Sequence, residues 1–275
     1  MKLQGAKVKI CLIALCVAGM LQASFAQSLK ASKTIKQDSV YLDFINLFSI
    51  PVEVNLSGKD SLGSEVRFKP YTLLHANETL KEALVIPLKS VKDTAQIQIE
   101  DYINFKATFG SPFSKEDGTR YILPYLKGMQ YEIMQSYGGA FSHKSTSSYY
   151  AIDFSLQVGD TVTAARDGVV FFVKEDSKEH CPTPKCIDKA NKILISHKDG
   201  TYANYVHLDY EGALVNVGDT IKAGDMIGIS GMTGFTTKPH LHFVVHKARS
   251  VSVPIRFKGV WRKKLKQGKL YRRKR

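Results

Sequence analysis

Cysteine is scarce in this sequence. Of its four cysteines, Cys11 and Cys16 lie close to the N-terminus, and only Cys181 and Cys186 follow. One close pair of thiols with no second pair nearby makes a poor structural zinc site. Two cysteines flanking a proline-rich turn, in a chain that is exported, instead predict a small disulfide-closed loop.

Long apolar runs are also missing beyond the first residues. Three lysines precede the apolar run Ile10–Leu21, and small residues follow it at Ser24–Ala26, as in a cleaved secretory signal. The run is shorter than the about 20 residues that span a bilayer. Cys16 follows Leu15, not the small residue usual before a lipid-modified cysteine. We therefore expect a signal peptide at 1–26, export to the periplasm or the extracellular cell envelope, and no transmembrane segment afterwards.

Acidic residues are absent from the C-terminal end. Residues 254–275 contain eleven Lys and Arg and no Asp or Glu, and with the three signal lysines they account for the whole formal charge of +14. A basic tail at 254–275 predicts contact with anionic envelope polymers or lipid head groups. A solvated, disordered end is the alternative. A nucleic-acid partner is not expected, since it would need a basic face on a folded domain.

Short alternating apolar runs fill residues 39–106, separated by turn-forming clusters. This pattern is typical of a small β-sandwich, and we see no catalytic group of residues in it. The composition changes in the stretch 110–118, which holds several turn-forming residues. We therefore expect an N-terminal β domain at 27–115 and a second domain at 116–253.

The second domain contains two near copies of one motif, Val-Gly-Asp-Thr followed by β-branched residues, starting at Val158 and Val217. Gly-Asp turns join short antiparallel strands, so we expect an all-β protein with few helices. Lipoyl and biotinyl carrier barrels show a similar repeat. That alternative lacks the modified lysine at a hairpin tip and leaves the histidines unexplained.

Two histidines are set in an apolar strand pattern after Pro239. In an extended strand His240 and His242 share one face, while Leu241 and Phe243 point into the core. A single histidine in a strand is more often a hydrogen-bonded structural residue. Histidines two apart on one face are a better indication of a shared ligand.

Two further polar residues occupy comparable positions. Asp153 lies between apolar residues of Ala151–Phe154, and His207 ends the run Tyr202–His207. Burying such groups without partners costs roughly 1–3 kcal/mol each. A metal ion can pair with several of them, and zinc prefers imidazole and carboxylate ligands with one position kept for water.

Taken together, these blocks resemble the lysostaphin-type zinc endopeptidases, which cleave peptide bridges and stems of bacterial cell walls. The likeness covers roughly residues 131–245. It is carried by Ala151-Ile-Asp-Phe, Val158-Gly-Asp-Thr-Val-Thr-Ala-Ala-Arg-Asp-Gly-Val-Val, Tyr205-Val-His-Leu, Val217-Gly-Asp-Thr-Ile-Lys-Ala-Gly-Asp-Met-Ile-Gly-Ile-Ser-Gly-Met-Thr-Gly and Pro239-His-Leu-His-Phe.

The resemblance implies an open antiparallel β-sheet with a groove and one zinc ion per chain. It makes Asp153 and His242 metal ligands and His207 and His240 catalytic residues. The family's usual first ligand, four residues before the aspartate, is Tyr149 here. Some relatives carry a Ser-His unit further upstream, so we assign His143 as the third ligand, with a solvent-facing loop histidine as the alternative.

The resulting hypothesis is an exported zinc metalloendopeptidase that hydrolyses peptide bonds of peptidoglycan stems or cross-links. Zinc lowers the pKa of its water toward about 7 and polarises the scissile carbonyl. His240 is the expected general base, and His207 steadies the oxyanion or passes a proton to the leaving amine. A serine hydrolase is disfavoured, because no Gly-x-Ser-x-Gly elbow occurs. The alternative is a degenerate member of the same fold that acts as a wall-binding or amidase-activating module.

Overall fold

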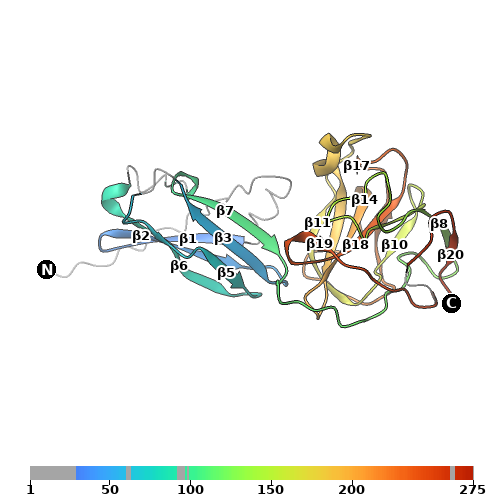
Figure 1. Ribbon diagram of the computed structural model, residues 1–275, viewed down its shortest axis with the longest axis horizontal. Helices are drawn as coiled ribbons and strands as arrows, with labels where there is room; N and C mark the ends of the chain where they lie inside the picture. Colours follow the sequence, from blue (N-terminus) through green and yellow to red (C-terminus); the bar gives the residue numbers. More distant parts are fainter. Residues whose placement is uncertain (1–28, 60–62, 92–96, 98, 261–263, 275) are drawn as a thin grey trace. The chain divides into compact units, whose positions relative to one another are not determined.

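The computed structural model describes residues 29–274, except 60–62, 92–96, 98 and 261–263. The predicted signal segment 1–26 therefore lies outside the described residues. The chain divides into two compact units, Met1–Thr108 and Phe109–Arg275 (Figure 1). Nearly all regular structure is β and most of the pairing is antiparallel, which confirms the predicted fold class.

The first unit is a sandwich of two antiparallel sheets. Along β2, Val40, Leu42 and Phe44 are buried and alternate with partly exposed residues. Phe44 meets Phe105 of the other sheet with ring centroids 5.4 Å apart, so the two inner faces share one core. One sheet has the order β1 (Leu29–Lys36), β2 (Ser39–Asn46), β6 (Thr79–Pro87), β4 (Arg67–Phe68), the other β5 (Tyr71–Leu74), β3 (Val52–Gly58), β7 (Ile103–Phe109), and two short 3₁₀ helices are η1 (Leu88–Ser90) and η2 (Ile99–Asp101).

The second unit is built on one large antiparallel sheet. Its main path runs β15-β11-β13-β14-β18-β9-β8-β20, while β16 pairs with β10 and β14, and β19 with β18. The strands are β8 (Gln130–Gln135), β9 (Ile152–Phe154), β10 (Thr161–Thr163), β11 (Gly168–Lys174), β13 (Asn191–Ser196), β14 (Tyr202–Ala213), β15 (Thr220–Ile221), β16 (Met226–Ser230), β18 (Leu241–Lys247), β19 (Val251–Ser252) and β20 (Leu270–Arg272), with the 3₁₀ turn η4 (Ala248–Ser250).

The two copies of the Gly-Asp motif form matching turns. Gly159 and Gly218 adopt φ values of 92° and 100°, a region that favours glycine. In each turn the aspartate carboxylate accepts the backbone N–H three residues before it, at 2.7 Å for both Asp160 and Asp219. The turns lead into β10 and β15, which confirms their predicted role.

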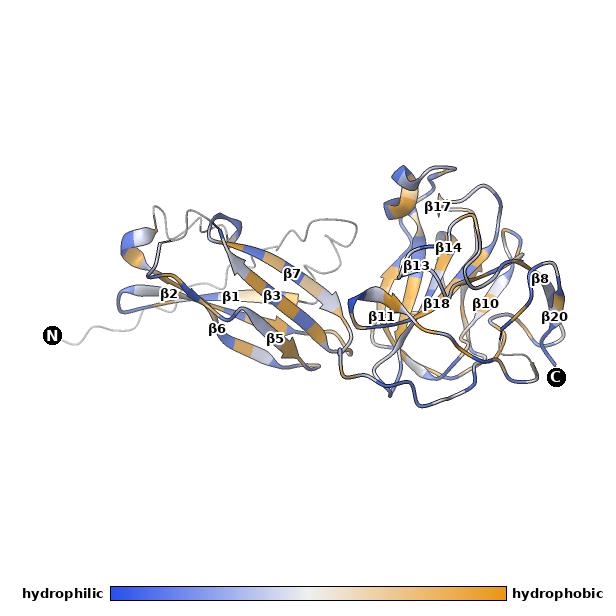
Figure 2. Ribbon diagram, viewed as in Figure 1, coloured by the Kyte–Doolittle hydropathy of each residue, from blue (hydrophilic) through white to orange (hydrophobic). Residues whose placement is uncertain are grey.

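One face of the large sheet packs into the core of the second unit. Leu241, Phe243 and Val245 of β18 lie there beside Ala203 and Tyr205 of β14. Full burial of a side chain such as Phe243 contributes about 2–3 kcal/mol. Figure 2 shows hydrophobic residues recurring along β11, β13 and β18. The intervening side chains of β18, including His242, lie on the opposite face.

The basic segment 254–275 is part of this unit where it is described. Its strand β20 pairs with β8, Phe257 and Leu265 are buried, and the Arg273 guanidinium donates to the Tyr125 carbonyl at 2.5 Å. The alternative of a solvated, disordered end is therefore wrong for the described residues, because a few widely spaced apolar side chains tie the segment to the core.

The predicted disulfide between Cys181 and Cys186 is confirmed, with Cα atoms 5.8 Å apart. It closes a loop that starts at β12 (His180–Cys181) and ends within the 3₁₀ helix η3 (Pro184–Lys189), and β12 pairs in parallel with β17 (Gly234–Phe235). Among the described residues, no helix is long and apolar enough to cross a membrane.

Candidate metal centre and catalytic pocket

The paired strands β9 and β18 place two of the predicted ligands side by side. Asp153 is the direct partner of His242 in the strand register, and His242 Nδ1 lies 2.8 Å from Asp153 Oδ1. The flanking residues Ile152 and Phe154 are fully buried in the core. Strand alternation therefore holds the carboxylate on the opposite face, as the sequence pattern predicts.

His143 reaches the same point from the turn segment between β8 and β9. Its side chain is fully buried, with Nδ1 3.0 Å from the Ser136 carbonyl oxygen and Nε2 3.2 Å from Asp153 Oδ1. Tyr149, at the family's usual ligand position, is 48% exposed and packs its ring on Gly138. The structure thus brings His143, and not Tyr149, to the two strand residues.

These three residues fit a zinc ion by their chemistry. Because only an N–H can donate to the Ser136 carbonyl, His143 Nδ1 carries the proton. In the neutral ring Nε2 therefore has a free lone pair. That lone pair faces Asp153 Oδ1 and, at 3.4 Å, His242 Nδ1. A proton on His242 Nδ1, or a cation held by all three side chains, allows these atoms to lie this close. Two imidazole nitrogens and one carboxylate oxygen are ligands that zinc favours.

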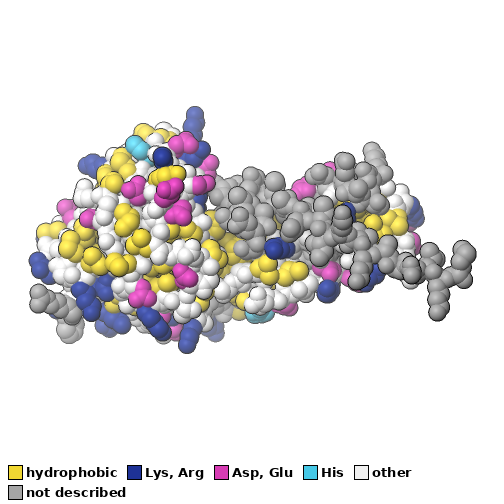
Figure 3. All heavy atoms as spheres, turned by 180° about the vertical axis from the view of Figure 1, so that it is seen from behind, with side chains coloured by type: hydrophobic (Ala, Val, Ile, Leu, Met, Phe, Trp, Pro, Cys, Tyr) yellow, Lys and Arg dark blue, Asp and Glu magenta, His cyan; other side chains and the backbone are white. Residues whose placement is uncertain are grey.

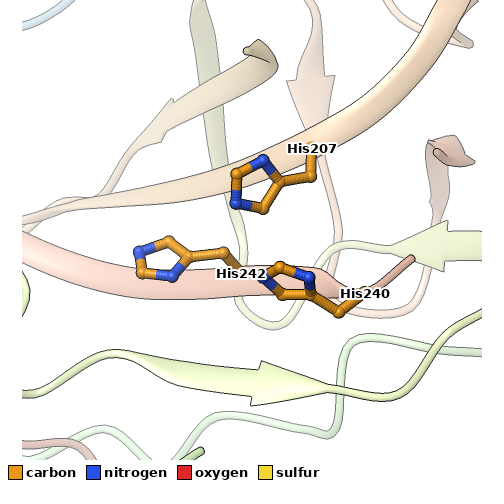
Figure 4. Close-up of side chains that lie close together, drawn as sticks. All are labelled: His207, His240 and His242. Carbon is orange, nitrogen blue, oxygen red and sulfur yellow. The ribbon is translucent and has the colours of Figure 1, made fainter. Parts of the chain in front are cut away.

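The two further histidines lie near His242 of this cluster (Figure 4). His240 Nε2 lies 3.8 Å from Asp153 Oδ1, and the His207 ring lies 4.5 Å from that of His240 and 5.9 Å from that of His242, between ring centroids. Figure 4 shows His207 facing the strand that carries His240 and His242. Ligand atoms of these three histidines also lie within 4.8 Å of one another.

His207 owes its position to a β-bulge. Lys192 pairs with Val206 but Asn191 pairs with Leu208, so His207 is an extra residue in β14. Its φ of 67° is left-handed, a conformation that costs of order 1 kcal/mol or more outside glycine. Strict alternation from Tyr205 would point His207 into the core. The bulge instead re-aims it to the face that carries His242.

Backbone carbonyls fix the orientation of both rings. His207 Nδ1 lies 2.6 Å from the Thr233 carbonyl oxygen, and His240 Nδ1 lies 2.9 Å from that of Lys238, with the Thr236 hydroxyl 3.2 Å away. In the neutral rings each Nδ1 therefore carries the proton, and each Nε2 offers a lone pair.

Burial and neighbouring charge shift the protonation of these groups. Burial raises the pKa of Asp153, but the bonds and charges of the histidines outweigh it and hold the pKa well below its usual range. Burial lowers the pKa of His143, and the bond and charge of Asp153 reverse this to a net rise. Burial, with the charge of His240, holds the pKa of His207 well below its ordinary value.

The cluster opens into a cavity of about 390 Å³. Asp153, His207, His240 and His242 line it. The rings of Phe141 and Phe235 also line it, with centroids 5.8 Å apart, and so do Lys238 and Gln267. The cavity thus presents an apolar wall, one cation and the histidine cluster to a bound molecule.

The sequence did not reveal three polar residues of this site. Thr233 and Thr236 hold His207 and His240, and buried Gln135 bonds to Asp153. A lone threonine or glutamine in a strand or turn carries no sequence signal of such a role. The other two buried histidines, His197 and His246, bond to backbone carbonyls away from the cluster, as expected for structural residues.

Comparison with known proteins gives one family. Residues 147–254 match Peptidase family M23. A glycyl-glycine endopeptidase of Staphylococcus capitis is 37% identical over 97 residues, which cover 35% of this chain and 24% of that protein. A peptidoglycan DD-endopeptidase of Vibrio cholerae is 30% identical over 100 residues, which cover 36% of this chain and 20% of that protein.

Among solved structures, the catalytic domain of lysostaphin from Staphylococcus simulans is 28% identical, with a TM-score of 0.33, and the match covers 46% of this chain and 86% of that one. The chain spans about a quarter or less of the curated relatives it matches. The matched range contains Asp153, His207, His240 and His242, while His143 lies just upstream of it. The second unit therefore carries a domain of peptidase family M23, a family of metallopeptidases.

Proposed function

We propose that this chain is an exported, zinc-dependent endopeptidase that hydrolyses peptide bonds in peptidoglycan stems or cross-links. The observation that carries the proposal is the convergence of His143, Asp153 and His242 on one point at the base of a cavity, with His207 and His240 beside them. The names of the two curated relatives, a glycyl-glycine endopeptidase and a peptidoglycan DD-endopeptidase, support this substrate class.

His143, Asp153 and His242 would hold the zinc ion. Three protein ligands are the number that catalytic zinc sites use, with a further position kept for water or substrate. When bound, zinc supplies Lewis acidity, lowering the pKa of water toward about 7 and polarising a carbonyl. The residues around it then have to place the peptide and move protons.

His240 and His207 supply the proton chemistry. In both rings the carbonyl-bonded Nδ1–H fixes the tautomer, so Nε2 is ready to accept a proton. His240 is the general base, since its Nε2 lies nearest to the ligand cluster, 3.8 Å from Asp153 Oδ1. Once protonated, a ring of this pair donates from Nε2 to the oxyanion or to the leaving amine, while its Nδ1–H bond stays in place.

The cavity walls suit a peptide with a carboxylate. Phe141 and Phe235 offer an apolar surface, and Lys238 is the one Lys or Arg among the described residues that line the cavity. Peptidoglycan stems contain both aliphatic side chains and free carboxylates. Such a peptide can therefore pack on the rings and pair with Lys238.

Export to the periplasm or the extracellular envelope is part of the proposal. The Cys181–Cys186 disulfide supports it, because disulfides persist in oxidising compartments. The predicted signal at 1–26 is consistent with this.

Activity is tested by measuring new amino termini released from purified peptidoglycan. We expect release by the zinc-loaded chain, loss of release with His240→Ala, and full release with the control His75→Ala, an exposed residue of the first unit. A chain that binds zinc but releases no amino termini would favour the degenerate, wall-binding alternative.

We also propose that the C-terminal segment contacts anionic envelope polymers or lipid head groups. Its described basic side chains are all exposed except Arg273. They are Arg256, Lys258, Lys264, Lys266, Lys269, Arg272 and Lys274. Figure 3 shows Lys and Arg side chains along the lower edge of the second unit.

This contact is tested without truncation, because the segment is part of the folded unit. Replacing Lys266, Lys269 and Arg272 by Gln should weaken binding to phosphatidylglycerol vesicles at low salt. Replacing the exposed lysines Lys115 and Lys198 in the same unit is the control. Binding that is insensitive to salt, or equal loss in both variants, would argue against the proposal.

A further inference from the structure

Gln135 lies next to the metal centre and belongs to neither the predicted ligands nor the predicted catalytic residues. It is the last residue of β8 and the direct strand partner of Asp153 in β9. Only 6% of it is exposed. An amide this deeply buried has to find partners for its N–H and C=O groups.

The Gln135 amide makes four hydrogen bonds around the site. Its Nε2 donates to Asp153 Oδ2 at 3.1 Å and to the Ser142 hydroxyl at 2.8 Å. Its Oε1 accepts from the backbone N–H of Phe141 at 2.9 Å and of Ser142 at 3.3 Å. Both donors and both acceptor sites of the amide are thus used, which fixes its orientation.

These bonds reach two of the three ligands. The bond to Oδ2 engages the carboxylate oxygen that faces away from the histidines, so Oδ1 alone is left toward His143 and His242. The bonds to Phe141 and Ser142 hold the turn just before His143. One side chain therefore ties the strand ligand to the loop ligand.

A charged side chain at position 135, or a side chain larger than hydrogen at position 139, would disturb this arrangement. A cation at position 135 would repel a metal ion, and a carboxylate would face Asp153 Oδ2 without a proton to donate. Space is equally restricted: a Cβ on Gly139 would lie 2.1 Å from Gln135 Cγ. Glycine at 139 is what lets the loop close over the amide.

We propose that Gln135 is a positioning residue of the metal centre, which leaves Oδ1 of Asp153 free to face His143 and His242 and fixes the loop that delivers His143. This inference rests on the zinc site of the proposed function. It accounts for how the chain builds a ligand set although the histidine usual at position 149 is absent.

The test is the zinc affinity of the purified chain, measured by competition with a chelating dye. Gln135→Met keeps the side-chain length and removes all four hydrogen bonds. We expect a loss of about 10- to 100-fold in zinc affinity, typical of residues that orient ligands. Gln130→Met, an exposed residue of the same strand, is the matched control and should leave the affinity unchanged.

Two more measurements separate positioning from general stability. The Co²⁺ absorption spectrum should change in intensity in Gln135→Met, because the surroundings of the Asp153 carboxylate change, and the metal-free variant should melt below the parent because buried hydrogen bonds are lost. Gly139→Ala should also weaken zinc binding, since its Cβ displaces Gln135 without removing the amide. Zinc affinities and Co²⁺ spectra are compared at a temperature at which circular dichroism shows every metal-free variant to be folded.

The outcomes are distinct. Zinc binding by the parent with unchanged affinity and Co²⁺ spectrum in the variants would overturn the role of Gln135 and leave the zinc site intact. Failure of the parent itself to bind zinc would overturn the proposed function.

Discussion

His197 makes the stability of the second unit depend on pH. Its side chain is buried, Nδ1 donates to the Asp167 carbonyl oxygen at 2.8 Å, and the buried Nε2 has no hydrogen-bond partner among the described residues. The ring packs edge-on against Tyr121. Burial lowers the pKa of His197 to about 4. The charge of Arg166 lowers it further, while the charges of Asp199 and Asp117 act in the opposite direction.

The sign and size of the effect follow from linkage. An unfolded histidine titrates near pH 6.5, so below that pH the unfolded chain binds a proton that folded His197 does not accept. The titration of His197 therefore leaves the free energy of unfolding unchanged above pH 6.5 and lowers it as the pH falls toward 4. With a pKa of 6.5 in the unfolded chain and about 4 in the folded chain, His197 lowers the free energy of unfolding by about 2–3 kcal/mol at pH 4.5.

The assay is urea unfolding at pH 7.5 and 4.5, with chelator present so that metal release makes no contribution. Near-ultraviolet circular dichroism of the buried tyrosines Tyr125 and Tyr205 reports the second unit. His197→Phe keeps a ring against Tyr121 but cannot titrate. Between pH 7.5 and pH 4.5, the free energy of unfolding of the variant should fall by about 2–3 kcal/mol less than that of the parent. Equal losses in both chains would refute this reasoning.

Three substitutions test other contacts. Thr236→Val removes a hydroxyl that lies 3.2 Å from His240 Nδ1. It should lower kcat about tenfold, which is the rate equivalent of one hydrogen bond, without changing the zinc content. An unaltered kcat would count against the orienting role of Thr236. Replacing Cys181 and Cys186 by Ser opens a short loop and should lower the free energy of unfolding by about 2 kcal/mol. A constant urea midpoint would contradict that. Arg273→Met removes the guanidinium that donates to the buried Tyr125 carbonyl and Thr163 hydroxyl, and it should lower the free energy of unfolding by about 2 kcal/mol or more. The exposed Arg272 is the control: Arg272→Met should change that free energy by less than about 0.5 kcal/mol.

Strand periodicity was sufficient to predict much of the fold. The alternation around Asp153 and around His242 predicts which side chains enter the core, and the structure pairs these two residues directly. The Gly-Asp turns were recognisable because positive φ and an aspartate that accepts a backbone N–H restrict the choice of residues.

The remaining features depend on contacts that no local pattern records. Alternation alone would place His207 in the core, and only the register shift between Asn191 and Lys192 reveals the bulge that turns it outward. Gln135 acquires its contacts when β8 pairs with β9. The basic composition of 254–275 concealed the buried Phe257 and Leu265, because the apolar residues are few and widely spaced.

The central claim is that His143, Asp153 and His242 bind one zinc ion. It is tested most directly by the zinc content of the purified mature chain, measured for the parent, for His143→Ala and for Tyr149→Phe. We predict one zinc per chain in the parent and in Tyr149→Phe, whose side chain lies outside the cluster, and loss of stoichiometric zinc in His143→Ala. Unchanged zinc in His143→Ala would contradict the assignment of that ligand, and a parent chain without zinc would contradict the account as a whole.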